Sequence, residues 1–245
     1  MKTILCLFVT PIIIATTPLL ADDSRGKEVE VEINKVYIPK KGFDDNDNIE
    51  AIAVGDLPNP CFTLSHVYAE KTTTGFTVHQ MAWKSEKGLC RTGDLIEDPV
   101  PFASPVAIGQ LDIGSYVIGG DGSKKRSFEV GEALTTKIDN FNYAIIRSVS
   151  SEQYYYNGDP ITFEVRGLLP DCTKLEESPN VEVLDDTILV LPIVKKSGEP
   201  CIHYAKPFKK SYTVGPLRPG SYLIHVRSRG GNAAYQPFNV WKERR

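Results

Sequence analysis

The chain of 245 residues is long enough for two domains of average size. Hydrophobic residues make up 41% of the sequence and charged residues 24%, which are ordinary values for a folded soluble protein. The formal net charge of -3 argues against a nucleic-acid-binding protein, because neutralising phosphates requires clustered Lys and Arg side chains.

Residues 1–21 predict a secretory signal peptide. Lys2 gives a short positive start, an apolar stretch follows, and Ala21 fits a cleavage site directly before the polar residues 22–24. The alternative is a membrane anchor, although the apolar stretch is short for a full span. No later segment is long and apolar enough to cross a bilayer. We therefore expect an exported protein, periplasmic or at the cell surface, with no membrane span once the signal is removed.

The rest of the sequence contains an internal repeat. Each copy carries a Leu-Pro motif closely followed by a cysteine, a second cysteine 29 residues later, the motif Leu-x-x-Gly-Ser-Tyr and a closing Phe-x-Val. Because four landmarks recur in the same order, we predict that the chain arose by duplication of one domain. The matched segments are 52–58 with 163–170 (after a one-residue slip), 111–117 with 217–223, and 128–130 with 238–240.

Local sequence patterns in both copies predict β-strands. Residues 28–33 alternate strictly between polar and apolar side chains, and residues 74–83 and 187–194 are rich in β-branched and aromatic residues. Glycine-rich turns at 119–122 and 230–232 each join two such runs, which predicts a C-terminal hairpin in each copy. About seven short strands in about 105 residues favour an Ig-like β-sandwich.

The expected fold class is therefore all-β, with two tandem Ig-like β-sandwich domains at 22–131 and 132–245. The tyrosines of the two Gly-Ser-Tyr motifs, Tyr116 and Tyr222, are expected to be core or corner residues of these domains. A binding tyrosine that is used twice is the alternative.

The mature chain has four cysteines, and an even count in an exported protein favours disulfides. Of the three pairings that four cysteines allow, one respects the repeat: Cys61 with Cys90, and Cys172 with Cys201. Closing a loop of about 30 residues removes unfolded-state entropy worth roughly 3–4 kcal/mol in the chain-entropy model. A zinc site is the alternative, but there is no Cys-x-x-Cys, and an oxidising compartment disfavours free thiolates.

The combined motif resembles the small Ig-like modules of bacterial exported proteins. It consists of Leu-Pro, a cysteine, a second cysteine, Leu-x-x-Gly-Ser-Tyr and Phe-x-Val, and the resemblance covers 28–130 and 137–240. It implies a fold and an exported location. It brings no catalytic residues to this chain.

The two copies differ in charge, with a net of -6 for residues 22–131 and +2 for residues 132–245. Domains so unlike in charge can face different surroundings or each other, and drift of solvated surfaces is the alternative.

Asp44, Asp45 and Asp47 of the first copy could supply hard oxygen ligands for Ca²⁺, the one cofactor that the sequence suggests. Their loop lacks the EF-hand glycine and the Glu at position twelve, so a solvated polar turn is the alternative.

The aligned place in the second copy holds Tyr154, Tyr155 and Tyr156, the strongest candidate for a binding surface. In a strand the first and third side chains share one face and the second lies on the other, so at least one ring should lie outside the core. Exposed tyrosines are common in recognition surfaces because they combine a large area with few rotatable bonds. Packing at a sheet edge or at the domain junction is the alternative.

A second candidate surface is the hairpin of the first copy, which carries Lys124, Lys125 and Arg126. These cations could contact an anionic glycan, a lipopolysaccharide or an acidic partner protein. Ordinary solvated charge on a hairpin is the alternative.

The sequence has no G-x-S-x-G elbow, no H-E-x-x-H and no phosphate-binding glycine loop. None of its four histidines recurs at an equivalent place in the other copy. The expected function is therefore non-catalytic: recognition of a protein or glycan in the periplasm or at the cell surface. The alternatives are a protease inhibitor or accessory subunit of an envelope complex, and a secreted hydrolase whose site is scattered through the sequence.

Overall fold

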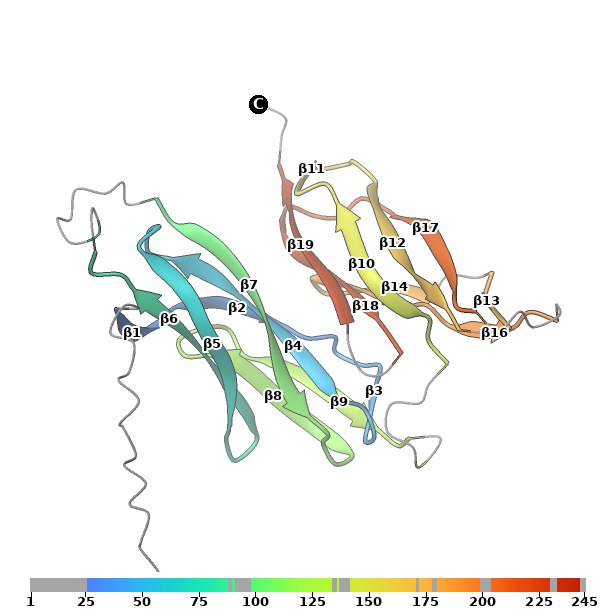
Figure 1. Ribbon diagram of the computed structural model, residues 1–245, viewed down its shortest axis with the longest axis horizontal. Coiled ribbons are helices and arrows are strands. Elements are labelled where there is room, and N and C mark those ends of the chain that lie inside the picture. Colours follow the sequence, from blue (N-terminus) through green and yellow to red (C-terminus); the bar gives the residue numbers. More distant parts are fainter. Residues whose placement is uncertain are drawn as a thin grey trace, which may run out of the picture.

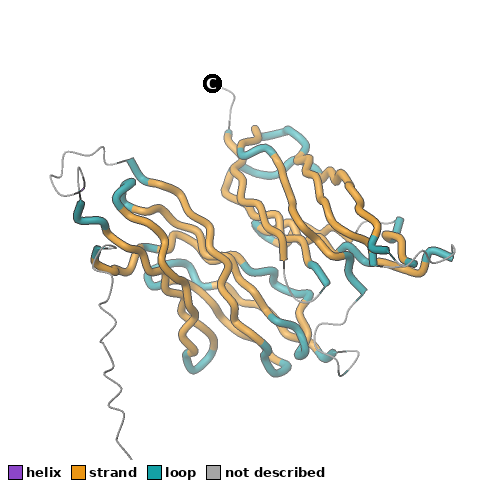
Figure 2. The backbone as a smooth tube through the Cα atoms, viewed as in Figure 1, coloured by secondary structure: helices purple, strands orange, loops and turns teal. Residues whose placement is uncertain are grey.

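The computed structural model of the chain is built from two groups of strands (Figure 1). It describes residues 26–87, 90, 98–133, 136, 142–170, 172–177, 180–198, 204–229 and 233–242. All nineteen elements are β-strands, which confirms the predicted all-β class (Figure 2). The described part of the chain contains no helix that is long and apolar enough to cross a membrane. The predicted signal peptide, residues 1–21, lies outside the described residues.

The first half of the molecule, residues 26–133, contains two sheets. The larger has the strand order β1-β6-β8-β9-β3, with β5 also paired to β6, and the smaller has the order β2-β4-β7. The strands are β1 Lys27–Val31, β2 Ile33–Tyr37, β3 Phe43–Asp44, β4 Ile49–Leu57, β5 Phe62–Lys71, β6 Gly75–Lys84, β7 Val100–Gly109, β8 Gly114–Gly120 and β9 Arg126–Gly131.

The second half, residues 142–242, contains two main sheets and one additional pair of strands. Their orders are β10-β12-β17, β11-β19-β18-β15-β14 and β13-β16. The strands are β10 Ile145–Ser151, β11 Tyr154–Tyr156, β12 Ile161–Leu169, β13 Thr173–Leu175, β14 Asn180–Leu184, β15 Thr187–Leu191, β16 Val194–Lys196, β17 Lys206–Val214, β18 Gly220–Arg227 and β19 Ala233–Trp241.

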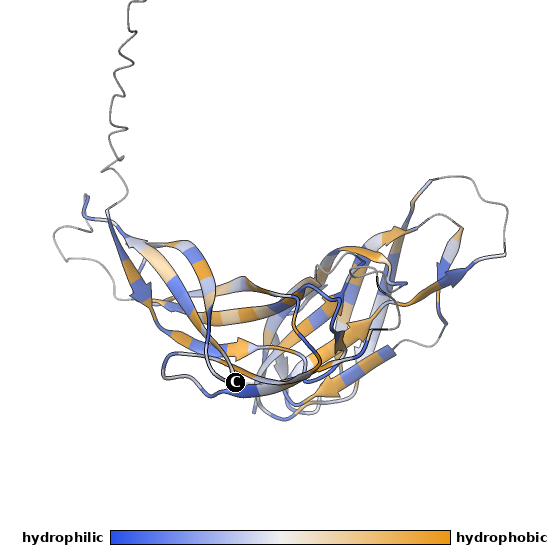
Figure 3. Cartoon of the chain, turned by 90° about the horizontal axis from the view of Figure 1, so that it is seen from below, coloured by the Kyte–Doolittle hydropathy of each residue, from blue (hydrophilic) through white to orange (hydrophobic). Residues whose placement is uncertain are grey.

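Each half has its hydrophobic core between its two main sheets. In the first half, Ala53 of β4 and Ile118 of β8 belong to one buried cluster. In the second half, Val165 of β12 and Ile224 of β18 do the same. Successive residues of a strand point to opposite faces, and β12 accordingly alternates between buried and more exposed positions. Figure 3 shows the same alternation of hydrophobic and hydrophilic residues along several strands.

The two halves share one strand order. The sheet β2-β4-β7 corresponds to β10-β12-β17, and the series β5-β6-β8-β9-β3 corresponds to β14-β15-β18-β19-β11. The directions agree as well, because β6 with β8 and β3 with β9 are parallel pairs, as are β15 with β18 and β11 with β19. Residues at matched positions of the two halves can therefore be compared directly.

A matched glycine lies within strands β4 and β12. A Cβ atom added to Gly55 would lie 2.4 Å from a backbone carbonyl oxygen and 2.7 Å from the Phe102 ring. One added to Gly167 would lie 2.3 Å from a carbonyl oxygen and 2.8 Å from the Phe208 ring. Both positions therefore require glycine, because another backbone and a ring approach closely. This match aligns the two Leu-Pro motifs without the one-residue slip that the sequence comparison used.

The tyrosines of the Gly-Ser-Tyr motifs are corner residues, as predicted. The hydroxyl of Tyr116 donates to the carbonyl oxygen four residues upstream at 2.8 Å, and the hydroxyl of Tyr222 does the same at 2.9 Å. Each ring stacks on the phenylalanine of the closing Phe-x-Val motif, with centroids 5.6 Å apart for Phe128 and 5.5 Å for Phe238. The repeated motifs thus fix the same turn and the same ring pair in both halves.

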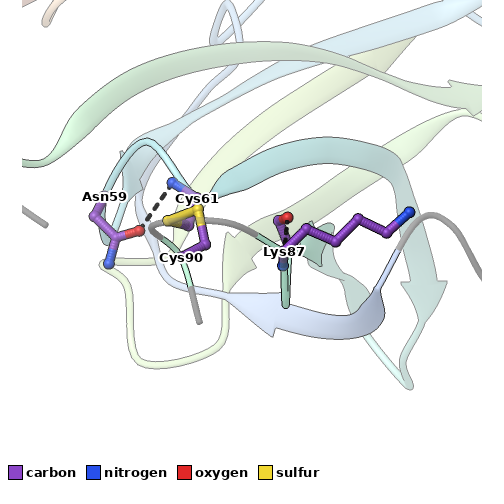
Figure 4. Close-up of a disulfide and its surroundings, with 5 residues drawn as sticks. Asn59, Cys61, Lys87 and Cys90 are labelled. Atoms are coloured by element: carbon purple, nitrogen blue, oxygen red, sulfur yellow. Dashed lines mark hydrogen bonds between the residues drawn. A yellow bond between two sulfur atoms is a disulfide. The ribbon is translucent and has the colours of Figure 1, made fainter. Parts of the chain in front are cut away.

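The predicted disulfide between Cys61 and Cys90 is present (Figure 4), and it joins Cα atoms that lie 5.6 Å apart. The backbone N–H of Cys61 donates to the side-chain oxygen of Asn59 at 3.0 Å. This hydrogen bond stabilises the short turn that follows β4, and the turn positions Cys61 for its disulfide with Cys90.

In the second half, Cys172 is also disulfide-bonded. Its predicted partner, Cys201, lies outside the described residues. The carbonyl oxygen of Cys61 accepts a hydrogen bond from the N–H of Ser85 at 2.9 Å, and that of Cys172 accepts one from Ser197 at 2.8 Å. The two cysteines therefore occupy matched places, and the pairing of Cys172 with Cys201 stays a prediction.

The hairpin β5–β6 is continuous in the first half, whereas its counterpart in the second half is divided. Strand β5 has one irregularity in its pairing, between Leu64 and Val67. Its counterpart in the second half is divided into two strands, β13 and β14. Strand β6 corresponds to β15 and β16, which are separated at Pro192. Proline has no N–H and cannot donate to a ladder, which accounts for the break. The matched residue in β6, Gln80, continues the strand.

Candidate functional site

The two halves pack together through strand β18. Six of its eight residues are buried, so both of its faces are covered. Ile224 and Val226 belong to the core of the second half. Leu223, on the opposite face, joins Tyr37 and Ile52 of the first half in a separate buried cluster. We call this contact region the junction.

A buried ion pair forms one end of the junction. Nη2 of Arg227 lies 2.7 Å from Oδ2 of Asp47, and the two side chains are only 2% and 5% exposed. The guanidinium also lies 4.9 Å from the centre of the Phe43 ring, a cation–π distance. Nε and Nη2 of Arg227 have no aligned hydrogen bond among the described residues, so the contact is primarily an ion pair.

The same ion pair changes the interpretation of the acidic loop. Asp47 is held by Arg227 and also accepts the backbone N–H of Asp44 at 3.1 Å. Oδ1 of Asp45 accepts the N–H of Ala133 at 2.9 Å. No group of three or more His, Cys, Asp or Glu side chains that could hold a metal ion occurs among the described residues, which include these three aspartates. The carboxylates of Asp45 and Asp47 thus contact the turn and the junction, and the calcium site stays a prediction.

A second group of charges lies at another part of the junction. Asp186, in the turn between β14 and β15, pairs with Arg126 of β9 and with Nζ of Lys35 at 2.5 Å. Burial acts to raise the pKa of Asp186, but the hydrogen bonds from Arg126 and Lys35 outweigh it and hold that pKa below its usual value. Of the predicted basic surface, Arg126 is thus engaged at the junction, whereas Lys124 and Lys125 are exposed.

Two titratable groups at the junction have buried polar atoms without a hydrogen bond: His225, which is buried, and Glu50, which is half-buried. Both ring nitrogens of His225 and Oε1 of Glu50 lack a hydrogen bond among the described residues. Burial, with a smaller contribution from the charge of Arg227, lowers the pKa of His225 to about 3. Burial raises the pKa of Glu50. His225 is therefore neutral at physiological pH.

A cleft of about 580 Å³ lies beside the junction, within the size range of small-ligand sites. Its lining comes from β2, β4 and β7 of the first half and from β11, β18 and β19 of the second. Its apolar side chains include Val54, Ala103 and Pro237. Its exposed or half-buried polar side chains, apart from Lys35, are Asn34, Asp56, Gln153, Ser221, Gln236 and Asn239.

The tyrosine run divides as the strand alternation predicted. Tyr155 is buried, and its hydroxyl donates to the carbonyl oxygen of Thr162 at 2.6 Å. Tyr154 is 55% exposed and lines the cleft. Its ring meets that of Trp241 edge-on, with centroids 5.5 Å apart, and Trp241 is 44% exposed. Tyr156 is half-buried.

Only part of the tyrosine run matches the acidic loop. The N–H of Tyr156 donates to Oδ2 of Asp159 at 3.3 Å, as the N–H of Asp44 donates to Oδ2 of Asp47. Asp44 therefore corresponds to Tyr156, and the sequence alignment of this segment was displaced by two residues. Tyr154 belongs to the strand before the turn and not to the turn itself.

The side chains of Ser65, His66 and Glu28 gather on the outer face of β1 and β5. Oγ of Ser65 lies 3.3 Å from Nδ1 of His66, and Oε1 of Glu28 lies 3.1 Å from the same nitrogen. A nucleophile–histidine–acid relay needs the hydroxyl and the carboxylate on different ring nitrogens. This cluster therefore has the composition of a hydrolytic triad without its geometry.

No family model, curated protein or solved structure matches this chain. A function for it must therefore follow from its own residues.

Of the residues at the cleft, sequence patterns indicated Tyr154. They did not indicate Trp241 or the four amide side chains of the cleft. Trp241 could have been found from its position, because it directly follows the closing Phe-x-Val motif of the second copy.

Proposed function

We propose that this chain is a non-catalytic exported binding protein, made of two tandem Ig-like β-sandwich domains (22–131 and 132–245) that arose by duplication. Its ligand, a protein or glycan of the periplasm or cell surface, occupies the cleft beside the junction. The shared strand order, the matched corner tyrosines and the disulfide support the architecture and an oxidising compartment.

One observation carries the proposed site: an exposed aromatic pair, Tyr154 and Trp241, stands beside a cleft that both halves line. Large rings that keep about half of their surface in water contribute little to folding, whereas such rings are frequent anchors in recognition. The cleft walls are also held in place, because the ion pairs of Arg227 and Asp186 fix the two halves on each other. A preformed site loses little conformational entropy on binding.

The test is affinity capture from an envelope extract of the source organism, with the oxidised chain 22–245 as bait. A Tyr154→Ser/Trp241→Ser double variant is run beside the wild type. Tyr204→Ser is the matched control, because Tyr204 is 77% exposed and does not line the cleft. Circular dichroism first establishes that all three baits fold.

We expect the wild type and Tyr204→Ser to retain the same component, and the double variant to lose at least 90% of it. Equal retention by all three baits would place any binding surface outside the cleft and overturn the proposal.

A further inference from the structure

The cleft has almost no net charge. Lys35 is its only cation, and Nζ of Lys35 pairs with Asp186 at 2.5 Å and donates to the carbonyl oxygen of Ser221 at 3.0 Å. Asp56 is its only anion and accepts a hydrogen bond from the amide of Asn34 at 2.8 Å. The opposite charges of Lys35 and Asp56 offset each other, so the described lining has no net charge with which to attract an ionic ligand. A neutral ligand fits best.

The remaining polar groups of the cleft are four side-chain amides, the hydroxyl of Ser221 and the phenol hydroxyls of three tyrosines, Tyr37, Tyr154 and Tyr222. Asn34 comes from β2, whereas Gln153, Gln236 and Asn239 lie on the opposite half. A carboxamide offers two donors and an acceptor, so it can bond to a group that both donates and accepts, such as an alcohol. Oγ of Ser221 donates to Oδ1 of Asn239 at 2.7 Å, which fixes that amide with its NH₂ group available. The amide nitrogens of Asn34 and Gln236 each donate one hydrogen bond within the protein, to Asp56 and to the carbonyl oxygen of Pro237, which leaves each amide a second N–H and its oxygen for a ligand.

The aromatic pair supplies the apolar part of the same recognition. Tyr154 and Trp241 meet at an interplanar angle of 84°, so they cover each other along an edge and not face to face. The edge of one ring therefore lies against a face of the other, and the surface that both rings expose is left for a ligand. A pyranose ring has one face of C–H bonds and a rim of hydroxyls, and it can stack on such a ring while its hydroxyls reach the amides.

We infer that the ligand of this cleft is a neutral saccharide, an inference that rests on the proposed function and names its ligand class. The sugar ring stacks at Tyr154 and Trp241, and its hydroxyls bond to Asn34, Gln236 and Asn239. Lys124 and Lys125 take no part, because they line a separate hollow of about 400 Å³.

The experiment uses the same captured material in three forms: untreated, digested with protease, and oxidised with periodate, which cleaves the vicinal diols of sugars. Retention by the wild type is measured against the Tyr154→Ser/Trp241→Ser variant and against Gln236→Met. The methionine keeps the length of the side chain and removes its hydrogen bonds. The retained component is also applied to an anion exchanger.

We expect protease to leave retention unchanged, periodate to lower it at least tenfold, and the component to pass through the exchanger. Gln236→Met should weaken retention about three- to tenfold. Retention that depends on the cleft but is lost with protease, or a component that binds the exchanger, would overturn the saccharide and leave the proposed function in place. Retention that does not depend on Tyr154 and Trp241 would overturn both.

Discussion

The edge formed by β3 and β9 in the first half matches the edge formed by β11 and β19 in the second. The first edge has glycines where the second has large aromatic side chains. By strand register, Tyr154 matches Gly42 and Trp241 matches Gly131. At Gly42 a Cβ atom would lie 3.3 Å from the Leu189 side chain, so the second half lies close to this edge. The fold forms with glycines at these positions, and the aromatic pair is therefore an addition to the fold and not a requirement of it.

The turns next to these edges show the same contrast. Asp47 and Asp159 make the same backbone hydrogen bond, yet Asp47 is buried against Arg227 whereas Asp159 is half-exposed. One half thus uses this end to contact its neighbour, and the other presents it to solvent. The same turn therefore packs against the other half in the first copy and faces solvent in the second.

The largest expected effect tests the buried turn. Arg227→Met should lower the free energy of unfolding by about 3–5 kcal/mol, because Asp47 would be left buried without a counter-charge. Asp159→Ala, at the matched turn, should cost clearly less, because Asp159 is half-exposed and water can replace its hydrogen bonds. Denaturant unfolding measures both. Similar losses at the two turns would contradict the contrast between them.

A double-mutant cycle sharpens this prediction. If the Asp47–Arg227 pair is the cause, Asp47→Asn combined with Arg227→Met should cost clearly less than the sum of the single changes. Arg229→Met, at an exposed position two residues away, is the control and should change stability by less than about 0.5 kcal/mol.

The second effect depends on pH and on His225. The unfolded chain protonates this histidine below its ordinary pKa of 6.5, whereas the folded chain does so only near pH 3. Stability should therefore fall as the pH falls between these values, with a slope that approaches about 1.4 kcal/mol per pH unit, or roughly 2 kcal/mol between pH 6.5 and 4.5.

His225→Leu should remove this contribution and flatten the acid side of the stability profile, measured by urea unfolding from pH 7.5 to 4.5. The matched strand β8 has Gly119 at this place, so the first half should contribute no such term. The exposed His66→Leu is the control. An unchanged slope in His225→Leu would show that other groups cause the acid sensitivity.

The third effect should be equal in the two halves. Tyr116→Phe and Tyr222→Phe each remove one hydroxyl-to-carbonyl bond and keep the stacked ring, so each should cost about 1 kcal/mol. Thermal unfolding of the two variants measures the difference. A loss confined to one of them would mean that the corners, although alike in geometry, are unequal in energy.

The smallest effect on stability belongs to the aromatic pair. Tyr154→Ser and Trp241→Ser should each change the free energy of unfolding by less than about 1 kcal/mol, because both rings keep about half of their surface in water. Tyr155→Ser, in the same strand, should cost about 3–5 kcal/mol, since that ring is buried. Chemical denaturation of the three variants measures the losses. A loss at Tyr154 or Trp241 as large as that at Tyr155 would mean that the aromatic pair serves packing and not binding.

The sequence predicted what local chemistry decides. The corner tyrosines, the disulfide of the first copy and the alternation of the tyrosine run all follow from motifs or from period-two patterns. The Pro192 break in the second copy could also have been found, because proline interrupts a ladder wherever it occurs. The alignment of Asp44 with Tyr154 was wrong because strand register, which the sequence does not show, matches Asp44 with Tyr156.

The junction could not be predicted from the sequence. Asp47 and Arg227 lie in different copies, and their pairing depends on which face of β18 turns toward the first half. Residue types alone gave the acidic loop two other interpretations, calcium and solvent. The cleft depends on the same packing, since its amides are distant in sequence and are brought together only when the two halves meet.

Strand β18 has a consequence for how the molecule comes apart. Its alternate side chains complete two different hydrophobic cores, with Ile224 in one and Leu223 in the other. Withdrawing this strand would open both at once, so the two halves should melt in a single calorimetric transition. Backbone amides of β18 should be among the slowest in the chain to exchange with deuterium, because they open only with the whole cooperative unit.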